Sequence, residues 1–563
     1  MDKNTKHKDR KKHHLTLLGK IVFSLLGICA LAVVLLGLRW AYIGIESMLP
    51  IDSTLDAFSA KALNREIVSL NAKEKRLDIR MCKSPDLYQD RFAQELSQIF
   101  DIYALGNCTY DQAMSAFSAY KLFDFCSDKA DFYINNAKSV KEGRQSLIRA
   151  RDFKKNSDFF SAIEQYLTVP SADRTAFAQA QGEAAEVFKQ ALPQIQQKLG
   201  GFLACFKTDM ARSYAQSLVR LLGQPAQALA EAVEQYEAFQ TNTVEYKGPV
   251  EHVFTHCLIA FPELCYSSPS MTKALDTDCI TPKEFTAILE NLYQKGYILI
   301  DINLLYDQST GSIASLKLPK GKKPLVLSID DVTYDSRKMH TGMVDKLIVD
   351  QNGDVCTYTL QDGREIISYD NEVFPIVNAF VRKHPDFSFR GARGTLCNTG
   401  FDGVFGYRTQ SEPIGNEKGI DRQSEIQQAK IVAESLKNEG WTFASHGFGH
   451  RHMSQISPQL AAQDTDSWQK EVVPIVGPTQ VMVWPYGDHV RKGEVHEYLY
   501  NAGFRIFCGV GSKPYLAKEP DGLGIFMDRK ALDGYSLRNR RESYMYLFDA
   551  QEVWDPLRPK ELP

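Results

Sequence analysis

From residue 246 to residue 563, short apolar runs alternate with segments of helical periodicity, and turn residues separate the two. Apolar runs of this length predict buried strands, and strands that alternate with helices build a parallel sheet covered by helices. We therefore expect a barrel-like α/β domain over residues 246–563. The predicted strands lie at residues 252–260, 297–302, 324–331, 441–445, 481–485 and 504–510.

Two local signals add detail to this domain. Asn352-Gly353 and Asp362-Gly363 are hairpin turns between alternating residues, so a β-meander is predicted as an insertion at about residues 348–370. Residues 281–296 form a predicted helix, because Thr281 and Glu284 have the spacing of a capping box and Gly296 is a stop signal.

Residues 45–245 differ in composition and periodicity: they are poor in glycine and proline, and their apolar side chains recur at helical spacing. This pattern predicts an all-α helical domain of roughly five to eight helices. No catalytic pattern occurs within it, so we interpret it as a spacer or as a surface for a protein partner.

The run Ile21–Leu38 carries no charge and follows a basic tail at residues 1–14. With its flanks, residues 15–40, it is long enough to cross the roughly 30 Å hydrocarbon core of a bilayer. Basic tails stay in the cytoplasm, so we expect a single-pass protein of the cell membrane, held in the lipid bilayer, with its catalytic domain extracytoplasmic. A cleaved signal peptide and lipid attachment at Cys29 are alternative interpretations of the same run.

Charge and cysteine content exclude some classes of function. The formal net charge is −3, from 66 Lys+Arg and 69 Asp+Glu, which gives no electrostatic footprint for nucleic acid. Eleven cysteines are present, and no two form a C-x-x-C pair, which argues against a thiolate zinc site. The cysteines outside the apolar run are compatible with disulfides and equally with buried free thiols.

Three polar clusters each follow a predicted strand directly. They are Asp330-Asp331, the segment from His446 to His450, and Pro485-Tyr486-Gly487-Asp488. The carboxyl ends of parallel strands meet at one edge, where several strands supply an active site together. Two imidazoles and one carboxylate form a metal-ligand set that leaves coordination positions open, and the adjacent carboxylate is then available as a base. The clusters predict a metal-dependent hydrolase of amides or esters.

The same residues resemble the motifs of the NodB-like polysaccharide deacetylases, metal-dependent carbohydrate esterases with a distorted (β/α) barrel. The segment Ser328–Val332 resembles T-F-D-D-G, the segment His446–His450 resembles H-S/T-x-x-H, and the segment Val483–Tyr486 resembles R-x-P-Y. Residues 387–409 and 527–535 are similar to a membrane-anchored bacterial subgroup of the family. The resemblance covers about residues 250–560 and leaves out the helical domain.

This resemblance implies roles for individual residues. Asp330 would be the general base, and Asp331, His446 and His450 would bind a divalent metal, zinc foremost, with Co²⁺, Ni²⁺ or Mn²⁺ as alternatives. The backbone N–H of Tyr486 would stabilise the oxyanion. The reaction would remove N-acetyl groups from N-acetylglucosamine-type units of a cell-wall or surface polysaccharide.

The chain also departs from the family pattern. Val483 stands where the family has an arginine that contacts the base, and no L-x-H motif supplies a general acid. Candidates for substrate contacts, and in the case of the arginines for the missing contact with the base, are Arg390, Arg393, Trp484 and Arg529. Candidates for the acid are His452, His489 and His496. Two alternatives stay open: an O-acetyl carbohydrate esterase, and a catalytically inactive glycan-binding or scaffold protein.

Overall fold

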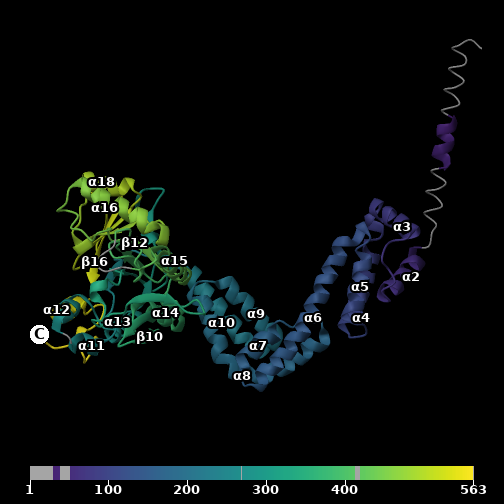
Figure 1. The fold of residues 1–563 in the computed structure, drawn as a ribbon, viewed down its shortest axis with the longest axis horizontal. Coiled ribbons are helices and arrows are strands. Elements are labelled where there is room, and N and C mark those ends of the chain that lie inside the picture. The colour runs from purple at the N-terminus through teal and green to yellow at the C-terminus, as the bar shows by residue number, and fades with distance from the viewer. Residues whose placement is uncertain (1–29, 39–50, 268, 413–418, 562–563) are drawn as a thin grey trace, which may run out of the picture. The chain divides into compact units, whose positions relative to one another are not determined.

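The computed structural model of the chain describes residues 30–38, 51–267, 269–412 and 419–561. Contacts divide the chain into two compact units, Met1–Ala184 and Ala185–Pro563, and helix α8 (Arg174–Ala204) runs through the division. Helices give way to strands later, at β1 (Thr243–Glu245). Figure 1 shows the order of the elements along the chain.

Only part of the predicted membrane segment belongs to the described residues. Residues 30–38 are helical and exposed, whereas the rest of residues 15–40 and the basic tail at residues 1–14 lie outside the described ranges. Among the helices that the structure describes, none combines the length and the apolar character that a bilayer crossing requires. The anchor stays a prediction.

The first unit confirms the predicted all-α region. Two of its helices begin with capping boxes, formed by Asn71 with Glu74 and by Thr109 with Gln112. Its core contains aromatic side chains in edge-to-face contact, such as Phe58 and Tyr120 with ring centroids 5.1 Å apart. The helices are α2 (Ile51–Leu63), α3 (Ala72–Lys83), α4 (Gln89–Ala104), α5 (Tyr110–Tyr120), α6 (Ser127–Lys155), α7 (Phe159–Leu167) and the first part of α8.

The second unit begins with the rest of α8 and with α9 (Thr208–Leu222) and α10 (Gln224–Thr241), which pack on each other. The strand β1 pairs with β6 (Lys317–Pro319), and Gln240 at the end of α10 donates to the carbonyl oxygen of Ser388 at 2.8 Å. These bonds attach α10 to the barrel that follows.

Seven parallel strands form a closed barrel, as the sequence predicts for this region. The order around it is β11-β12-β13-β14-β16-β2-β7, and pairing of β7 with β11 closes the ring. The strands are β2 (Glu251–His256), β7 (Lys323–Asp330), β11 (Thr395–Asn398), β12 (Thr442–Ser445), β13 (Val481–Val483), β14 (Ile506–Val510) and β16 (Ile525–Ala531).

The barrel is distorted because β7 has different neighbours along its length. Its first residues pair with β3 (Tyr297–Leu299), and its last residues pair with β11. The pleat of β7 sends Leu325, Leu327 and Ile329 outward to the surrounding helices, while Val326 packs inside the barrel. Ser328 and Asp330 continue the inward face, so the acidic side chain of Asp330 lies inside the barrel at its carboxyl end.

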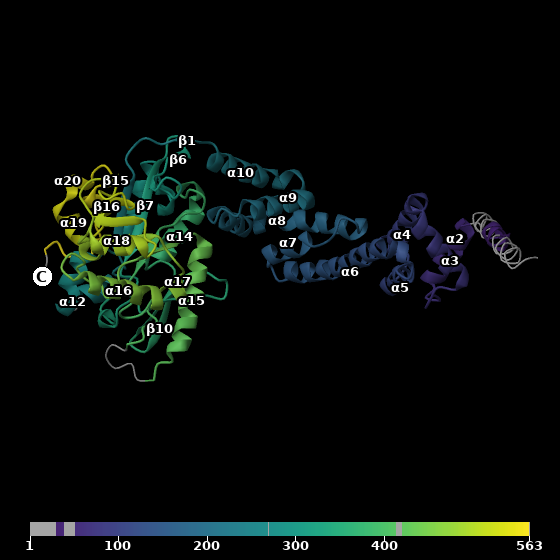
Figure 2. The ribbon, with the colours of Figure 1, turned by 90° about the horizontal axis from the view of Figure 1, so that it is seen from above.

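Helices surround the strands, and Figure 2 shows the long helix α15 (Arg422–Glu439) along one side of this unit. Helix α13 (Pro282–Gln294) has the predicted capping box of Thr281 and Glu284. The other helices are α11 (Pro262–Ser267), α12 (Pro269–Asp278), α14 (Val373–Lys383), α16 (Pro458–Glu471), α17 (Val473–Val476), α18 (Glu494–Asn501), α19 (Gly534–Asn539), α20 (Arg541–Tyr544) and α21 (Ala550–Val553).

The predicted β-meander is present between β7 and α14. It is an antiparallel sheet of β8 (Lys346–Val349), β9 (Val355–Gln361) and β10 (Arg364–Ser368), with turns at the two predicted Asn-Gly and Asp-Gly pairs. Short pairs complete the unit: β4 (Tyr306–Asp307) with β5 (Ser312–Ile313), and β15 (Leu516–Lys518) with β16.

Candidate metal centre

Asp330 ends β7 inside the barrel and pairs with Arg529 of β16. The guanidinium donates to both carboxylate oxygens, from Nη1 to Oδ1 at 2.7 Å and from Nη2 to Oδ2 at 3.0 Å, and both side chains are buried. Burial by itself raises the pKa of a carboxyl group, but Arg529, with a smaller contribution from His446, lowers the pKa of Asp330 well below its ordinary value. Asp330 is thus held in the charged form.

Asp331 follows immediately but leaves the strand. Its φ of 57° lies in the left-handed region, so its carboxylate turns away from that of Asp330. Its Oδ1 lies 3.9 Å from Nε2 of His446 and 3.6 Å from Nε2 of His450. That oxygen is buried and has no hydrogen-bond partner among the described residues. Buried polar atoms normally have a hydrogen-bond partner, so an unpartnered carboxylate oxygen between two imidazoles fits the role of a metal ligand.

His446 extends β12 at its carboxyl end. Its Nδ1 donates to the carbonyl oxygen of Val483 at 2.8 Å, which leaves the lone pair of Nε2 directed at the two aspartates. One ligand atom from each of Asp331, His446 and His450 lies within 4.8 Å of the others. The spacing fits a divalent ion bound by all three side chains.

His450 is held by the loop between β12 and α16. Asp464 of α16 accepts from the backbone N–H groups of Phe448 and Gly449 at 2.7 and 2.8 Å. Gly447 has a φ of 68°, and His450 itself has a φ of 48°, so the loop makes a tight turn that brings the second histidine back to the first. Burial and the neighbouring His446 lower the pKa of His450 to about 4, which favours the neutral imidazole that a metal requires.

Tyr486 lies beside the histidines and is 61% exposed. Its ring stacks on His452 with centroids 3.9 Å apart and contacts His450 at 4.4 Å. Its φ of 59° is also left-handed. Asp331, His450 and Tyr486 therefore all have strained backbone conformations, and strain of this kind concentrates at functional sites.

The structure separates the four predicted substrate contacts. Arg529 lies in the site, bonded to Asp330. Trp484 is fully buried on the outer face of the barrel, against Phe507, so no face of its ring is open to a sugar. Arg393 is buried and donates to the carbonyl oxygens of Ala204 and Gly391, and Arg390 is exposed beside Gln240 of α10. Neither of these two arginines bonds to the aspartates: Arg393 contacts the end of α8, and Arg390 contacts α10.

The three histidines considered as general acid have other surroundings. His496 is buried and bonded to Asp521 at 2.7 Å, which closes it off from substrate. His489 contacts the carbonyl oxygen of Gly487, and His452 lies 3.6 Å from Asp488.

One histidine at the site was not singled out from the sequence. His256 ends β2 and stands opposite Asp330 in the strand register. Its Nδ1 bonds to the carbonyl oxygen of Asp278 at 2.9 Å, and its charge contributes to the lowered pKa of both aspartates. The available signal was its place at the end of a predicted strand, the same signal that pointed to the three polar clusters.

Comparison with known proteins adds a family match for part of this unit. Residues 420–507 match the family model described as polysaccharide deacetylase. The matched segment contains His446, His450 and Tyr486, and it ends before Arg529. A segment of polysaccharide deacetylase type is thus built into the seven-strand barrel.

Two solved structures are similar to the chain. The deacetylase PplD of Streptococcus pyogenes, in complex with acetate, is 13% identical, with a TM-score of 0.31, over 51% of this chain and 94% of that one. The deacetylase domain of BpsB from Bordetella bronchiseptica is 15% identical, with a TM-score of 0.28, over 51% of this chain and 99% of that one. A search of curated proteins found no match.

Proposed function

We propose that the chain is a metal-dependent deacetylase that removes N-acetyl groups from N-acetylglucosamine-type units of a cell-wall or surface polysaccharide. The observation that carries the proposal is the grouping of Asp331, His446 and His450 within 4.8 Å, beside a separately paired Asp330. The polysaccharide deacetylase match over residues 420–507 supports the substrate class.

The three side chains fit a divalent ion, with zinc as the first choice because its ligands are imidazole nitrogens and a carboxylate oxygen. A bound ion supplies Lewis-acid activation of water and polarises the acetyl carbonyl group. The chain's own contribution is the arrangement: Val483 fixes the tautomer of His446, and Asp464 fixes the loop of His450.

Asp330 acts as the general base. Its two hydrogen bonds to Arg529 keep it ionised and fix the plane of its carboxylate, so it accepts a proton from the attacking water. Arg529 thereby makes the contact with the base that the family's arginine makes at the position of Val483. The backbone N–H of Tyr486, on the turn beside His450, donates to the oxyanion as the acetyl carbon becomes tetrahedral.

His256 is the proton donor in this proposal. The carbonyl oxygen of Asp278 orients its ring, and its register with Asp330 on the adjacent strand puts it beside the base at the same edge of the barrel. When the C–N bond breaks, His256 protonates the leaving amine, so the products are acetate and a free amino sugar.

We also propose that residues 15–40 hold the enzyme in the cell membrane with the barrel on the extracytoplasmic side. The support is the sequence of that segment. Protease added to intact cells should remove the barrel, and protection of the barrel until the cells are lysed contradicts this placement.

The test of activity is acetate release from N-acetylglucosamine oligomers by the full chain loaded with zinc. Wild type should release acetate, and Asp330→Asn should abolish release while retaining the metal. Acetate from O-acetylated xylan with none from N-acetyl sugars would select the O-acetyl esterase instead. Glycan binding without bound metal or acetate release would select the inactive scaffold.

A further inference from the structure

A large hollow lies at the end of the barrel opposite the metal centre. Its volume is about 820 Å³, within the roughly 300–1,000 Å³ of ligand sites in general. It is lined by residues at the starts of β12, β13 and β14, including Thr442, Gln480 and Arg505. These strands are parallel, so their amino ends share one edge, and His446 and Tyr486 follow the opposite ends of β12 and β13.

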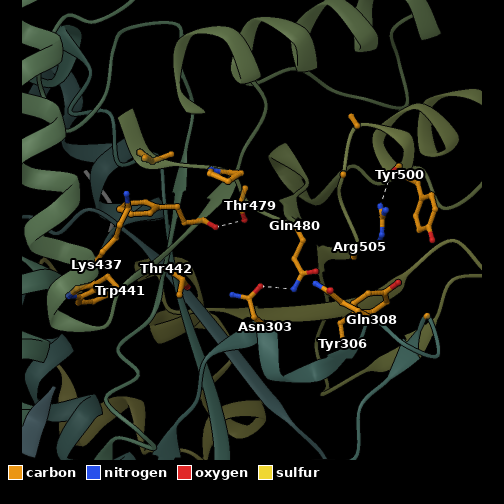
Figure 3. Close-up of a pocket in the computed structure, with 16 residues that line it drawn as sticks. Asn303, Tyr306, Gln308, Lys437, Trp441, Thr442, Thr479, Gln480, Tyr500 and Arg505 are labelled. Carbon is orange, nitrogen blue, oxygen red and sulfur yellow. Dashed lines mark hydrogen bonds between the residues drawn. The ribbon is translucent and has the colours of Figure 1, made fainter. Parts of the chain in front are cut away.

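The lining is neutral to basic. Among the described residues no carboxylate lines the hollow, whereas Lys437 and Arg505 do; the ammonium group of Lys437 also donates to Glu434, outside the lining, at 2.7 Å. Arg505 stacks on the ring of Tyr500 at 3.9 Å and has no carboxylate partner in the described part of the chain. Figure 3 shows Lys437 and Trp441 on one side of the hollow and Arg505 and Tyr500 on the other.

Amide side chains fill the space between these two sides. Gln480 donates from Nε2 to Oδ1 of Asn303 at 2.9 Å, and Figure 3 shows this pair at the centre. The bond uses the donor side of Gln480 and leaves its Oε1 as an acceptor. Gln308 is exposed at the rim. The hollow thus offers amide groups, a stacked guanidinium and an ammonium group, and its lining also contains Trp441 and Phe443.

We propose that this hollow is a second glycan-binding site, which holds a distant stretch of the same polysaccharide while the metal centre acts on another. Amides and a guanidinium pair with neighbouring sugar hydroxyls, and the half-buried ring of Tyr500 offers an edge to a sugar ring. The lack of carboxylates admits neutral and anionic chains alike. This inference rests on the proposed function, because it takes its ligand from that reaction.

The site raises the effective concentration of polymer at the barrel without adding any group to the chemistry. Its signature is a dependence on chain length. A short oligomer occupies one site at a time, so only a polymer gains affinity from both.

The test compares the N-acetylglucosamine trimer with glycol chitin, a soluble N-acetylglucosamine polymer, in the full chain. The double variant Gln308→Ala/Lys437→Ala removes an amide and a cation from the rim, and Gln427→Ala/Lys470→Ala removes the same residue types from exposed positions on α15 and α16. We expect the rim variant to raise KM for glycol chitin about fivefold or more, with kcat and both trimer constants unchanged. The control variant should match wild type on both substrates.

A KM for glycol chitin within twofold of wild type overturns the inference, as does an equal rise for the trimer. If wild type releases no acetate at all, the proposed function has failed, and the second glycan-binding site is then tested by chitin binding alone. Co-sedimentation with insoluble chitin should then still fall about fivefold in the rim variant relative to the control variant. Equal sedimentation of the two variants overturns the second site.

Discussion

The two ends of the barrel are built from the same strands but differ in chemistry. At the carboxyl end, Asp330 is buried and paired with a buried arginine, and Asp331, His450 and Tyr486 have left-handed backbone conformations. At the amino end, the lining includes amides, hydroxyls and the partly exposed cations Lys437 and Arg505, and Arg505 donates to the carbonyl oxygens of Tyr500 and Phe504. The carboxyl end thus combines a buried, paired charge with three non-glycine residues in the left-handed region.

The difference shows which end of the barrel accommodates features that destabilise the folded state. Burying a charge and turning a non-glycine residue into the left-handed region each destabilise the folded state unless neighbours over-determine the arrangement. The carboxyl end supplies those neighbours, such as Arg529 for Asp330 and Asp464 for the loop of His450. At the amino end, the partly exposed Arg505 needs no carboxylate partner, because backbone carbonyl oxygens of Tyr500 and Phe504 accept from it.

The largest effect is expected from removing a metal ligand. His446→Ala should lower acetate release by roughly 10³-fold or more, because several kcal/mol of transition-state stabilisation depend on the ion. Elemental analysis should find the metal lost as well. His489→Ala is the matched control, since His489 bonds only to the carbonyl oxygen of Gly487 among the described residues, and it should retain the metal. Equal loss in both variants would remove the ligand assignment.

Next in size is the pairing of the buried charges. Arg529→Met leaves the buried Asp330 carboxyl group without its partner, which should lower the free energy of unfolding by about 3–5 kcal/mol in denaturant titrations. The double variant Asp330→Asn/Arg529→Met should recover most of that loss, because it removes the uncompensated charge. A double variant as unstable as the single one would show that Arg529 acts through packing instead.

The stability of the folded state should depend on pH through a second buried carboxyl group near the carboxyl end, that of Glu372. Glu372 accepts from the backbone N–H of Leu258, just beyond β2, and burial raises its pKa to about 8 from 4.5. The folded state therefore retains a proton that the unfolded state has released, so this contribution is complete below pH 4.5 and is lost as pH rises toward 8. Glu372→Gln should flatten the stability profile in that interval, and an unchanged slope would assign it to another group.

The smallest effect is expected at the amino end. The hydroxyl group of Thr479 donates to the carbonyl oxygen of Phe443 at 2.6 Å and accepts from the N–H of Val481. Thr479→Ala should cost about 0.5–1.5 kcal/mol in thermal unfolding, and Thr479→Ser should cost less. Metal content and kcat on the trimer should be unchanged in both. A loss of metal would show that the two ends are coupled after all.

The strands that contain continuous apolar runs could be predicted from the sequence, and so could the residues that directly follow them. Asp330, Asp331 and His446 were found this way, because a strand of buried residues that meets a polar one marks a sheet edge. The β-meander and the cap of α13 followed from turn and capping chemistry, which acts over a few neighbouring residues and needs no tertiary context.

Other features depend on contacts that the sequence does not display. The strand β16 contains Asp528, Arg529 and Lys530, and its charges hide it from any search for apolar runs; they are accommodated because Arg529 meets Asp330 inside the barrel. Trp484 was assigned to sugar contacts, yet the pleat of β13 turns Val483 inward and Trp484 outward into the core.

The pairing of β16 with β2 sets an order of events for a growing chain. Lys530 pairs with Val253, so the ring stays open until β16 has left the ribosome. Until then Asp330 has no guanidinium beside it, and the inward face of β7 is exposed to water. A chain that lacks β16 therefore has its metal ligands and its base but not the guanidinium that orients the base, so the proposed site is complete only once β16 has joined the barrel.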